Sequence, residues 1–315
     1  MPKVSVIIPV YGVENYIERC ARSLFEQTLD DIEYLFIDDC TYDRSVEVLK
    51  QVIEEYPARK EQVIIHRMEC NSGQAVVRKW GMQNAKGNYV IHCDSDDWVD
   101  NDMYRCMYEK AIEKDADIVV SDYYISDGVG NNKIRIGSSG ENVNAFIEGV
   151  ISRKFSWALW NKMVKRGVYA ESFIYPSGDM GEDTIICLQM LLNSKIMVYV
   201  NTPLYYYFEN SNSITNKYSR EAIIRRFEQS VANGSVFLKI CKERNLYEKY
   251  QNEIEIILLG KKNLIRPLVG EKNYYLLWKN TFPEINYSIL SNKKIGLKDK
   301  SIHILILLGL YRHGL

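Results

Sequence analysis

Residues 4–121 alternate short apolar runs with longer stretches in which apolar residues recur every three or four positions. The apolar runs predict buried strands, and the recurring spacing predicts amphipathic helices between them. The predicted strands are Val4–Val10, Tyr34–Ile37, Val63–Ile65, Tyr89–Cys93 and Asp117–Ser121. Such alternation is typical of a mostly parallel sheet flanked by helices, which predicts an α/β fold.

The pattern changes in the second half of the chain. Residues 126–141 are rich in Gly, Asn and Ser and predict a loop, and residues 142–216 mix short helices with strands. From about residue 218 the pattern is helical, as in Ala222–Ile240 and Asn252–Leu264. We therefore expect one α/β domain over residues 1–216 and a helical C-terminal region over residues 217–315.

Three segments with polar residues lie at the carboxyl ends of predicted strands. These segments are Pro9-Val10-Tyr11, Asp38-Asp39 and Asp94-Ser95-Asp96. In a parallel sheet, ligands bind beyond the carboxyl ends of the strands. The three segments therefore predict a binding site along one rim of the sheet.

Asp94-Ser95-Asp96-Asp97 is the densest group of carboxylates at this rim. Mg²⁺ or Mn²⁺ commonly binds one or two carboxylates together with phosphate oxygens, so the group predicts a metal-bound phosphate. An acidic turn before the helix that starts near Asn101 is the structural alternative. The sequence has neither a dinucleotide-binding glycine loop nor a P-loop, so a cation would have to neutralise bound phosphates.

Composition restricts the remaining classes of protein. The net charge of −1 provides no overall field to recruit nucleic acid. Seven scattered cysteines without a C-x-x-C pair predict reduced thiols and a cytoplasmic protein. The first apolar run predicts a strand, not a signal peptide, and no run approaches the roughly 20 apolar residues of a membrane span.

An ordered series of motifs runs through about the first 215 residues. The segments are VSVIIPVYGVENYI at residues 4–17, Ser23-Leu24, Gln27-Thr28, Phe36-Ile37-Asp38-Asp39, Asn71-Ser72-Gly73, Arg78, Gly81, Ala85-Lys86-Gly87, Asp94-Ser95-Asp96-Asp97-Trp98, Trp160-Asn161-Lys162, Gly181-Glu182-Asp183 and Ser213-Ile214-Thr215. In this order they resemble the family 2 glycosyltransferases of the GT-A fold. The helical remainder is only generally similar to bacterial members.

The resemblance implies a nucleotide-sugar site at the predicted rim. Its residues would be Pro9, Val10, Tyr11, Glu14, Asp39, Gly73, Arg78, Asp94 and Ser95. Tyr11 would lie against the uracil of a uridine nucleotide, and Asp39 would accept a hydrogen bond from that base. Asp94 would bind the ribose or the neighbouring sugar, and Arg78 would shape the pocket. Asp96 would bind Mn²⁺ or Mg²⁺ on the diphosphate.

The resemblance also implies a catalytic base, Asp183, with Glu182 beside it. Inverting transfer needs a base for the acceptor hydroxyl and a cation for the departing diphosphate. The alternative is that these acids only stabilise a helix N-terminus. Trp157, Trp160 and Lys162 are the expected acceptor residues, although both tryptophans could instead pack inside the protein.

Three positions depart from the usual family pattern without removing a carboxylate. Cys40-Thr41 stands where Gly-Ser is frequent, Gly12 where Asn is common, and Val77-Arg78-Lys79 where Ala-Arg-Asn is common. The carboxylates needed for activity are all present, so we expect an active enzyme with a differently shaped donor pocket.

The predicted function is inverting, metal-dependent transfer from a UDP-sugar to a hydroxyl of a bacterial surface glycan or lipid-linked oligosaccharide. Two alternatives are a non-catalytic nucleotide- or glycan-binding module and a sugar nucleotidyltransferase. The latter usually has a basic Gly-rich loop near its N-terminus, which Pro9–Tyr16 lacks.

The C-terminus predicts where the protein works. Lysines precede an apolar run that ends at Leu310, a pattern that suits peripheral contact with the anionic cytoplasmic membrane face. The alternative is a terminal helix packed on the protein. The residues concerned are Lys293, Lys294, Lys298, Lys300, Ile302, Ile304–Leu308 and Leu310.

Overall fold

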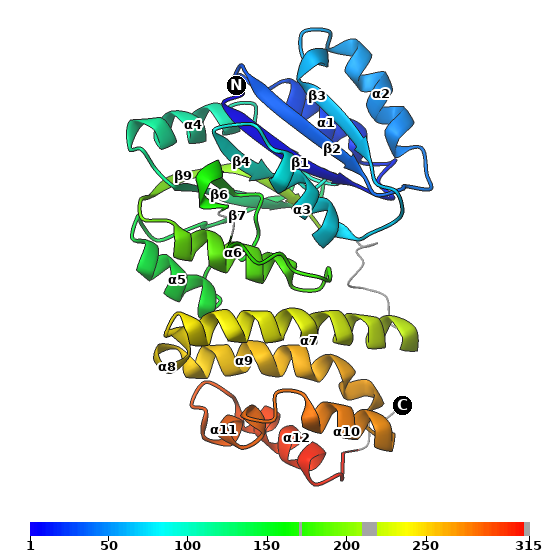
Figure 1. The fold of residues 1–315 in the computed structure, drawn as a ribbon, viewed down its shortest axis with the longest axis vertical. Helices are drawn as coiled ribbons and strands as arrows, with labels where there is room; N and C mark the ends of the chain where they lie inside the picture. Colours follow the sequence, from blue (N-terminus) through cyan, green and yellow to red (C-terminus); the bar gives the residue numbers. More distant parts are fainter. Residues whose placement is uncertain (170–171, 210–218, 312–315) are drawn as a thin grey trace. The chain divides into compact units, whose positions relative to one another are not determined.

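The computed structural model describes residues 1–169, 172–209 and 219–311, which form two compact units (Figure 1). The α/β unit comprises Met1–Pro176 and Glu182–Ser213, and the helical unit comprises Ser177–Gly181 and Ile214–Leu315. The predicted motif Ser213-Ile214-Thr215 and the predicted domain boundary after residue 216 lie outside the described residues.

Over the described residues of the α/β unit, nine strands form one sheet. The order is β3 (Val63–Arg67), β2 (Ile32–Asp38), β1 (Val4–Val10), β4 (Tyr89–His92), β8 (Lys162–Lys165), β6 (Ile118–Ser126), β9 (Met197–Phe208) and β5 (Trp98–Val99), with β7 (Asn132–Arg135) paired to β6. Six of these strands run in one direction. β8 is antiparallel to both of its neighbours, β4 and β6. The predicted α/β class with a mostly parallel sheet is confirmed.

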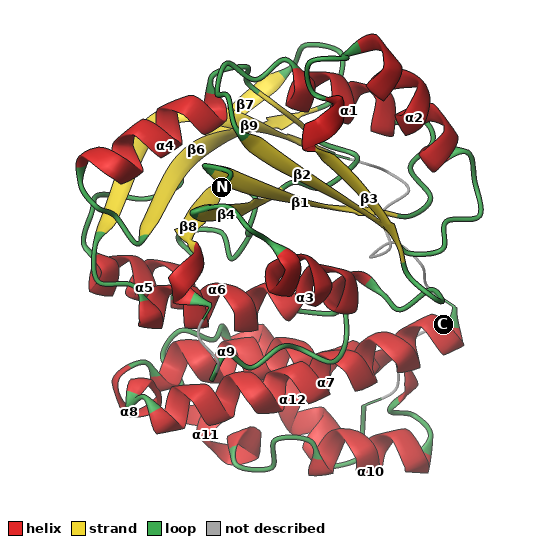
Figure 2. Cartoon of the chain, turned by 45° about the horizontal axis from the view of Figure 1, so that its top comes forward, coloured by secondary structure: helices red, strands yellow, loops and turns green. Residues whose placement is uncertain are grey.

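Helices cover both faces of this sheet (Figure 2). One face carries α1 (Ile17–Phe25), α2 (Ser45–Glu55) and α4 (Met103–Glu113), and the other carries α3 (Gln74–Asn84), α5 (Val143–Ile151) and α6 (Glu182–Asn193). Short 3₁₀ turns lie at Lys60–Gln62 and Arg166–Val168. Because both faces are covered, β1 and β2 are buried along almost their whole length.

Gly81 explains how α3 reaches the sheet. A Cβ atom at this position would come within 2.5 Å of Ile7 Cγ2, so only glycine lets the helix pack this closely on β1. Close packing matters here because α3 also carries Arg78 towards the rim.

β7 corrects the expectation of a loop over residues 126–141. This strand pairs antiparallel with β6 after a turn in which the Asp127 carboxylate accepts hydrogen bonds from the amides of Val129 and Asn131. All four residues of β7 are exposed. An exposed strand carries no apolar pattern, so only its pairing reveals it.

The helical unit contains α7 (Arg220–Glu243), α8 (Leu246–Lys249), α9 (Gln251–Lys262), a 3₁₀ helix (Asn263–Leu268), α10 (Lys272–Asn280), α11 (Ile285–Ser291) and α12 (Leu297–Leu307). Its core is formed by Phe227, Ile265, Val269, Trp278 and Ile306. The helical C-terminal region is therefore confirmed. Across the described residues, none of the helices combines the length and apolarity required to cross a bilayer.

The segment Ser177–Gly181 belongs to the helical unit although it precedes α6 in the chain. The Asn233 side-chain amide on α7 donates to the carbonyl oxygens of Gly178 at 2.6 Å and Met180 at 3.1 Å. A Cβ atom at Gly178 would come within 2.9 Å of Gln229, so the backbone lies directly on α7.

Candidate functional site

Hydrogen bonds tie together the loops that follow β1 and β2. The Gly12 amide donates to Thr41 Oγ1 at 2.9 Å, and the Glu14 amide donates to Asp43 Oδ2 at 3.0 Å. The Glu14 carboxylate in turn accepts a hydrogen bond from the Arg44 amide at 3.0 Å. Glu14, a predicted donor-binding residue, thus holds the two loops in register at the rim.

Two exposed aromatic rings lie at this end of the sheet. Tyr11 is 45% exposed and Tyr42 is 80% exposed, with ring centroids 5.6 Å apart and ring planes at 71°. Pro9 and Val10 form the end of β1 just before Tyr11, and the Val10 side chain is buried. Tyr42 was not among the predicted residues, because only its proximity to Tyr11 in space indicates a role.

The paired aspartates after β2 are both buried and hydrogen-bonded. Asp39 Oδ1 accepts from the Ser72 amide at 2.7 Å, and Oδ2 accepts from the Gly73 amide at 2.9 Å. Asp38 forms an ion pair with Arg67. Gly73 has φ +87°, which favours glycine, and directly precedes α3. Asp39 therefore fixes the backbone that leads into the helix of Arg78.

Arg78 joins three separate segments of the site. Its side chain is 4% exposed, and Nη2 lies 2.7 Å from Asp94 Oδ1 while Nε lies 3.8 Å from Glu182 Oε1. Burial works against the positive charge, yet the neighbouring carboxylates raise the pKa of Arg78 overall. Removing one partner of a buried ion pair typically costs about 3–5 kcal/mol. The arginine thus links α3, the end of β4 and the start of α6.

Glu182 and Asp183 begin α6 and differ in environment. Burial and the neighbouring Asp183 raise the pKa of Glu182 to about 8, so Glu182 is mostly protonated at neutral pH. Asp183 is half-buried, and its Oδ1 accepts hydrogen bonds from the Thr184 amide and hydroxyl at 2.7 and 3.3 Å. Its Oδ2 makes no hydrogen bond within the described residues.

Glu182→Gln is expected to flatten the dependence of thermal stability on pH. The pKa of Glu182 rises from 4.5 to about 8 on folding, so between these values only the folded chain keeps the proton. The stability that this proton provides is complete below pH 4.5 and is lost as the pH rises through about 8. Glutamine cannot titrate. Melting temperatures measured across this window should fall less in the variant, and parallel curves would contradict the assignment.

Asp94–Asp97 forms a tight turn at the end of β4. The Asp97 amide donates to the Asp94 carbonyl oxygen at 3.1 Å, and Ser95 inside the turn is buried. Arg19 Nη2 on α1 donates to the Asp96 carbonyl oxygen at 3.0 Å, and the guanidinium lies 3.7 Å from the centroid of the Trp98 ring. Arg19 on α1 therefore holds the backbone of the turn in place.

The donor set of this turn fits a cation shared with a ligand. Among the side chains that the structure describes, no group of three or more His, Cys, Asp or Glu residues is arranged to hold a metal ion. A cation on a nucleotide needs only one or two protein carboxylates, because phosphate oxygens complete its coordination. Asp94 is already paired with Arg78, and Asp96 is half-buried beside it in the same turn.

Asp97 and Tyr205 form a buried pair that sequence reasoning missed. The Tyr205 hydroxyl donates to Asp97 Oδ2 at 2.6 Å, and the Phe208 amide donates to Oδ1 at 2.7 Å. Burial, together with nearby Asp96 and Asp94, raises the pKa of Asp97 well above its usual value. The run of four consecutive aromatic residues at the end of β9 was the available signal, but it did not reveal which ring faces the turn.

Trp160 lies in the core, where it supports this pair. It is 6% exposed, and its ring stacks on Tyr205 at 4.3 Å and on Tyr207 at 5.8 Å between centroids. This burial favours the alternative that Trp160 packs inside the protein, and its contact with an acceptor stays a prediction.

Lys162 is also enclosed. It is 1% exposed, burial lowers its pKa, and Nζ donates to the carbonyl oxygens of Ser156 and Ala158 and to Asn161 Oδ1 at 2.6–3.0 Å. These acceptors use all three ammonium protons, which argues against the expected acceptor contact. Trp157 is half-buried, and its contact with an acceptor stays a prediction.

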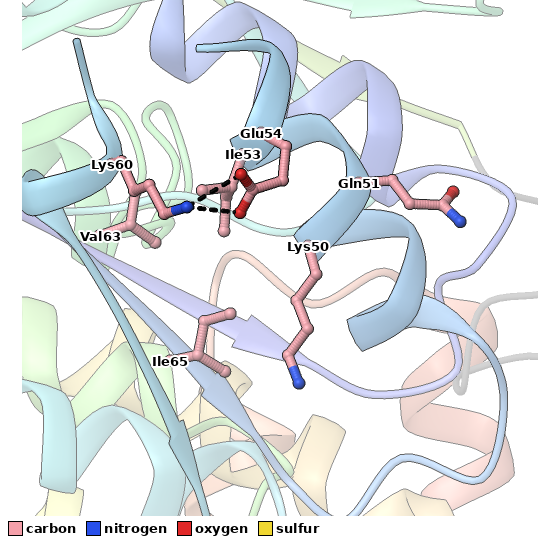
Figure 3. A pocket seen from close by; sticks show the side chains of 7 residues that line it. All are labelled: Lys50, Gln51, Ile53, Glu54, Lys60, Val63 and Ile65. Atoms are coloured by element: carbon pink, nitrogen blue, oxygen red, sulfur yellow. Dashed lines mark hydrogen bonds and ion pairs between the residues drawn. The ribbon is translucent and has the colours of Figure 1, made fainter. Parts of the chain in front are cut away.

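A separate groove of about 540 Å³ lies between α2 and β3 (Figure 3). Its walls combine aliphatic side chains with the ion pair of Lys60 and Glu54. The lining residues are Lys50, Gln51, Ile53, Glu54, Lys60, Val63 and Ile65. None of these residues belongs to the predicted site.

Known proteins share sequence or fold with this chain. Glycosyltransferase GlyA of Streptococcus pneumoniae serotype 4 is 32% identical over 231 residues, which cover 70% of this chain and 32% of GlyA. The match therefore spans about a third of that relative's length.

Two solved structures share the fold. S. aureus TarS 1–349 in complex with UDP matches with a TM-score of 0.67 and 18% identity over 98% of this chain and 88% of that fragment. The same fragment was also solved with UDP-GlcNAc. The mannosyltransferase PcManGT of Pyrobaculum calidifontis, in complex with GDP-Man and Mn²⁺, has a TM-score of 0.55 and 13% identity over 98% and 86% of the two chains.

The family follows from the sequence itself. Residues 5–167, more than half of the 315, match the family described as glycosyl transferase family 2. This segment contains the loops after β1 and β2, Arg78 and the Asp94–Asp97 turn. The chain belongs to glycosyl transferase family 2.

Proposed function

We propose that the chain is an inverting glycosyltransferase with a UDP-sugar donor and a hydroxyl acceptor on a bacterial surface glycan or lipid-linked oligosaccharide. The observation that carries the proposal is Arg78, whose side chain pairs with Asp94 and contacts Glu182, the residue next to Asp183. The TarS complexes with UDP and UDP-GlcNAc support a uridine donor.

The donor end of the site suits a nucleotide. Tyr11 offers an exposed ring surface for a base, with Tyr42 beside it, and Asp39 stabilises the backbone next to them. Asp94, held by Arg78, would accept hydrogen bonds from the ribose or the sugar. Asp96 would bind Mn²⁺ or Mg²⁺, and a bound cation would stabilise the departing diphosphate. The Mn²⁺ in PcManGT supports this assignment.

The acceptor end needs one base. Asp183 Oδ2 would take the proton of the acceptor hydroxyl. The acceptor oxygen would at the same time attack the anomeric carbon, and the bond from that carbon to the diphosphate would break. A protonated Glu182 adds no charge beside the incoming diphosphate, so it leaves Asp183 as the proton acceptor. No sugar–enzyme bond is required for this single displacement.

The test is a donor screen that measures UDP release from several UDP-sugars, with and without Mn²⁺. We expect release from one donor or a few, dependent on Mn²⁺ and increased by acceptor glycan. A non-catalytic module would bind UDP without releasing it from UDP-sugars. A nucleotidyltransferase would instead release pyrophosphate from a nucleoside triphosphate and a sugar phosphate. Either of these results would overturn the proposal.

We also propose a cytoplasmic location with peripheral membrane contact through α12. Ile306 and His303 are buried in the helical unit, which anchors the helix, while other apolar side chains of the run remain exposed. Lys298 and Lys300 lie on the same helix. The exposed apolar residues are Leu297, Ile304, Leu305, Leu308 and Leu310. Exposed apolar residues with adjacent lysines suit an anionic lipid surface.

Lys298→Glu with Lys300→Glu is expected to weaken co-sedimentation with anionic vesicles. Each basic residue near such a surface contributes about 1 kcal/mol, so reversing two charges should reduce binding by more than tenfold. Lys50→Glu with Lys195→Glu changes the net charge equally in the α/β unit and serves as the control. Equal binding by both double variants, or no binding by the unchanged chain, would reject membrane contact through α12.

A further inference from the structure

One hydroxyl group holds both ends of the turn that carries Asp94 and Asp96. The Asp94 amide donates to the Tyr205 hydroxyl oxygen at 3.1 Å, and the same hydroxyl donates to Asp97 Oδ2 at 2.6 Å. The backbone bond from the Asp97 amide to the Asp94 carbonyl oxygen closes the turn. Tyr205 thus spans the first and last residues of the turn from a strand more than 100 positions away in the sequence.

The Tyr205 side chain has little freedom to move. It is fully buried, and its ring stacks almost parallel on Trp160, with 4.3 Å between centroids and 9° between planes. Its backbone pairs with Val99 of β5 and Tyr123 of β6. Because both the backbone and the ring of Tyr205 are held in this way, the position of its hydroxyl is fixed.

The turn needs such a fixed partner because three carboxylates lie within four residues. Asp97 is 1% exposed, and without Tyr205 its carboxylate would keep only the Phe208 amide as a donor. A buried carboxylate that loses a donor either takes up a proton or turns towards water or a cation. The Tyr205 hydroxyl therefore holds Asp97 inside the protein, next to the half-buried Asp94 and Asp96.

We propose that Tyr205, supported by Trp160, is a positioning residue that fixes the donor- and metal-binding turn. The inference rests on the proposed function, because the turn matters only if a nucleotide diphosphate and a cation bind there. Tyr205 itself touches neither ligand in this proposal. Its effect is on the direction in which the Asp94 and Asp96 carboxylates point.

The test compares Tyr205→Phe with Tyr34→Phe in the full chain. Tyr205→Phe keeps the stacked ring and removes only the hydroxyl. Tyr34 is equally buried in the same unit, and its hydroxyl donates to the Leu24 carbonyl oxygen at 2.5 Å, so its loss tests the cost of a buried hydrogen bond away from the turn. Binding of UDP is measured by calorimetry over a range of Mn²⁺ concentrations, with melting temperatures recorded for each variant.

We expect Tyr205→Phe to bind UDP roughly tenfold more weakly, as for loss of a hydrogen bond to a charged group, and to need more Mn²⁺ for half-saturation. Tyr34→Phe should lose stability while keeping both values within about twofold of the unchanged chain. Unchanged UDP and Mn²⁺ dependence in Tyr205→Phe would overturn the positioning role alone, as would equal losses in both variants. If the unchanged chain binds no UDP at any Mn²⁺ concentration, the proposed donor and this inference are both rejected.

Discussion

Asp96→Ala is expected to abolish sugar transfer while leaving the melting temperature nearly unchanged. Asp96 is the proposed metal ligand, and without it the charge that develops on the diphosphate loses its main stabilisation. A loss of several kcal/mol of transition-state stabilisation corresponds to a decrease in turnover of roughly 10³-fold or more. Turnover is measured as UDP release at saturating donor and Mn²⁺.

Asp30→Ala is the control for this variant. Asp30 is exposed and precedes β2, so it lies at the end of the strand opposite the rim. Asp30→Ala makes the same chemical change as Asp96→Ala, but at a position outside the turn. Full turnover by Asp96→Ala, or by the unchanged chain in a chelator, would reject the metal assignment.

Asp183→Asn should lower turnover by roughly 10²-fold or more without weakening donor binding. Asparagine keeps the size of the side chain and the oxygen that accepts from Thr184, but it cannot take a proton. The measurements are turnover at saturating donor and UDP affinity by calorimetry. Loss of UDP binding with turnover preserved at saturation would assign Asp183 to the donor pocket.

Glu182→Gln is the matched control for Asp183→Asn. It makes the same chemical change one residue earlier, at a carboxyl group that is already mostly protonated at neutral pH. Glutamine resembles that protonated form, so the decrease in turnover should be much smaller. A loss as large as that of Asp183→Asn would indicate that Glu182 takes the proton.

The strands of the sheet could be predicted where burial on both faces leaves an almost continuous apolar run, as in Val4–Val10. The exposed β7 could not, because no face of it is buried. The position of the rim could be predicted from polar residues at strand ends. The contacts that each rim residue makes could not, because its partners come from distant segments of the chain.

Arg78 and Glu182 illustrate this limit, since nothing in their local sequence indicates a contact between α3 and α6. Trp160 and Lys162 illustrate a second limit, because both side chains of this predicted acceptor motif are buried. A motif identifies residues that matter for the site, but it does not separate those that contact a ligand from those buried behind it. Their burial in the core was decided by the packing of β8 and β9.

The segment Ser177–Gly181 has a consequence for building chimaeric enzymes. These five residues are anchored by Asn233 of the helical unit, yet Gly181 is bonded directly to Glu182, one residue before the proposed base. A graft that replaces only the chain after residue 213 would remove that anchor and disturb the approach to α6. Exchanging helical regions between relatives therefore requires two junctions, so that residues 177–181 travel with their own α7.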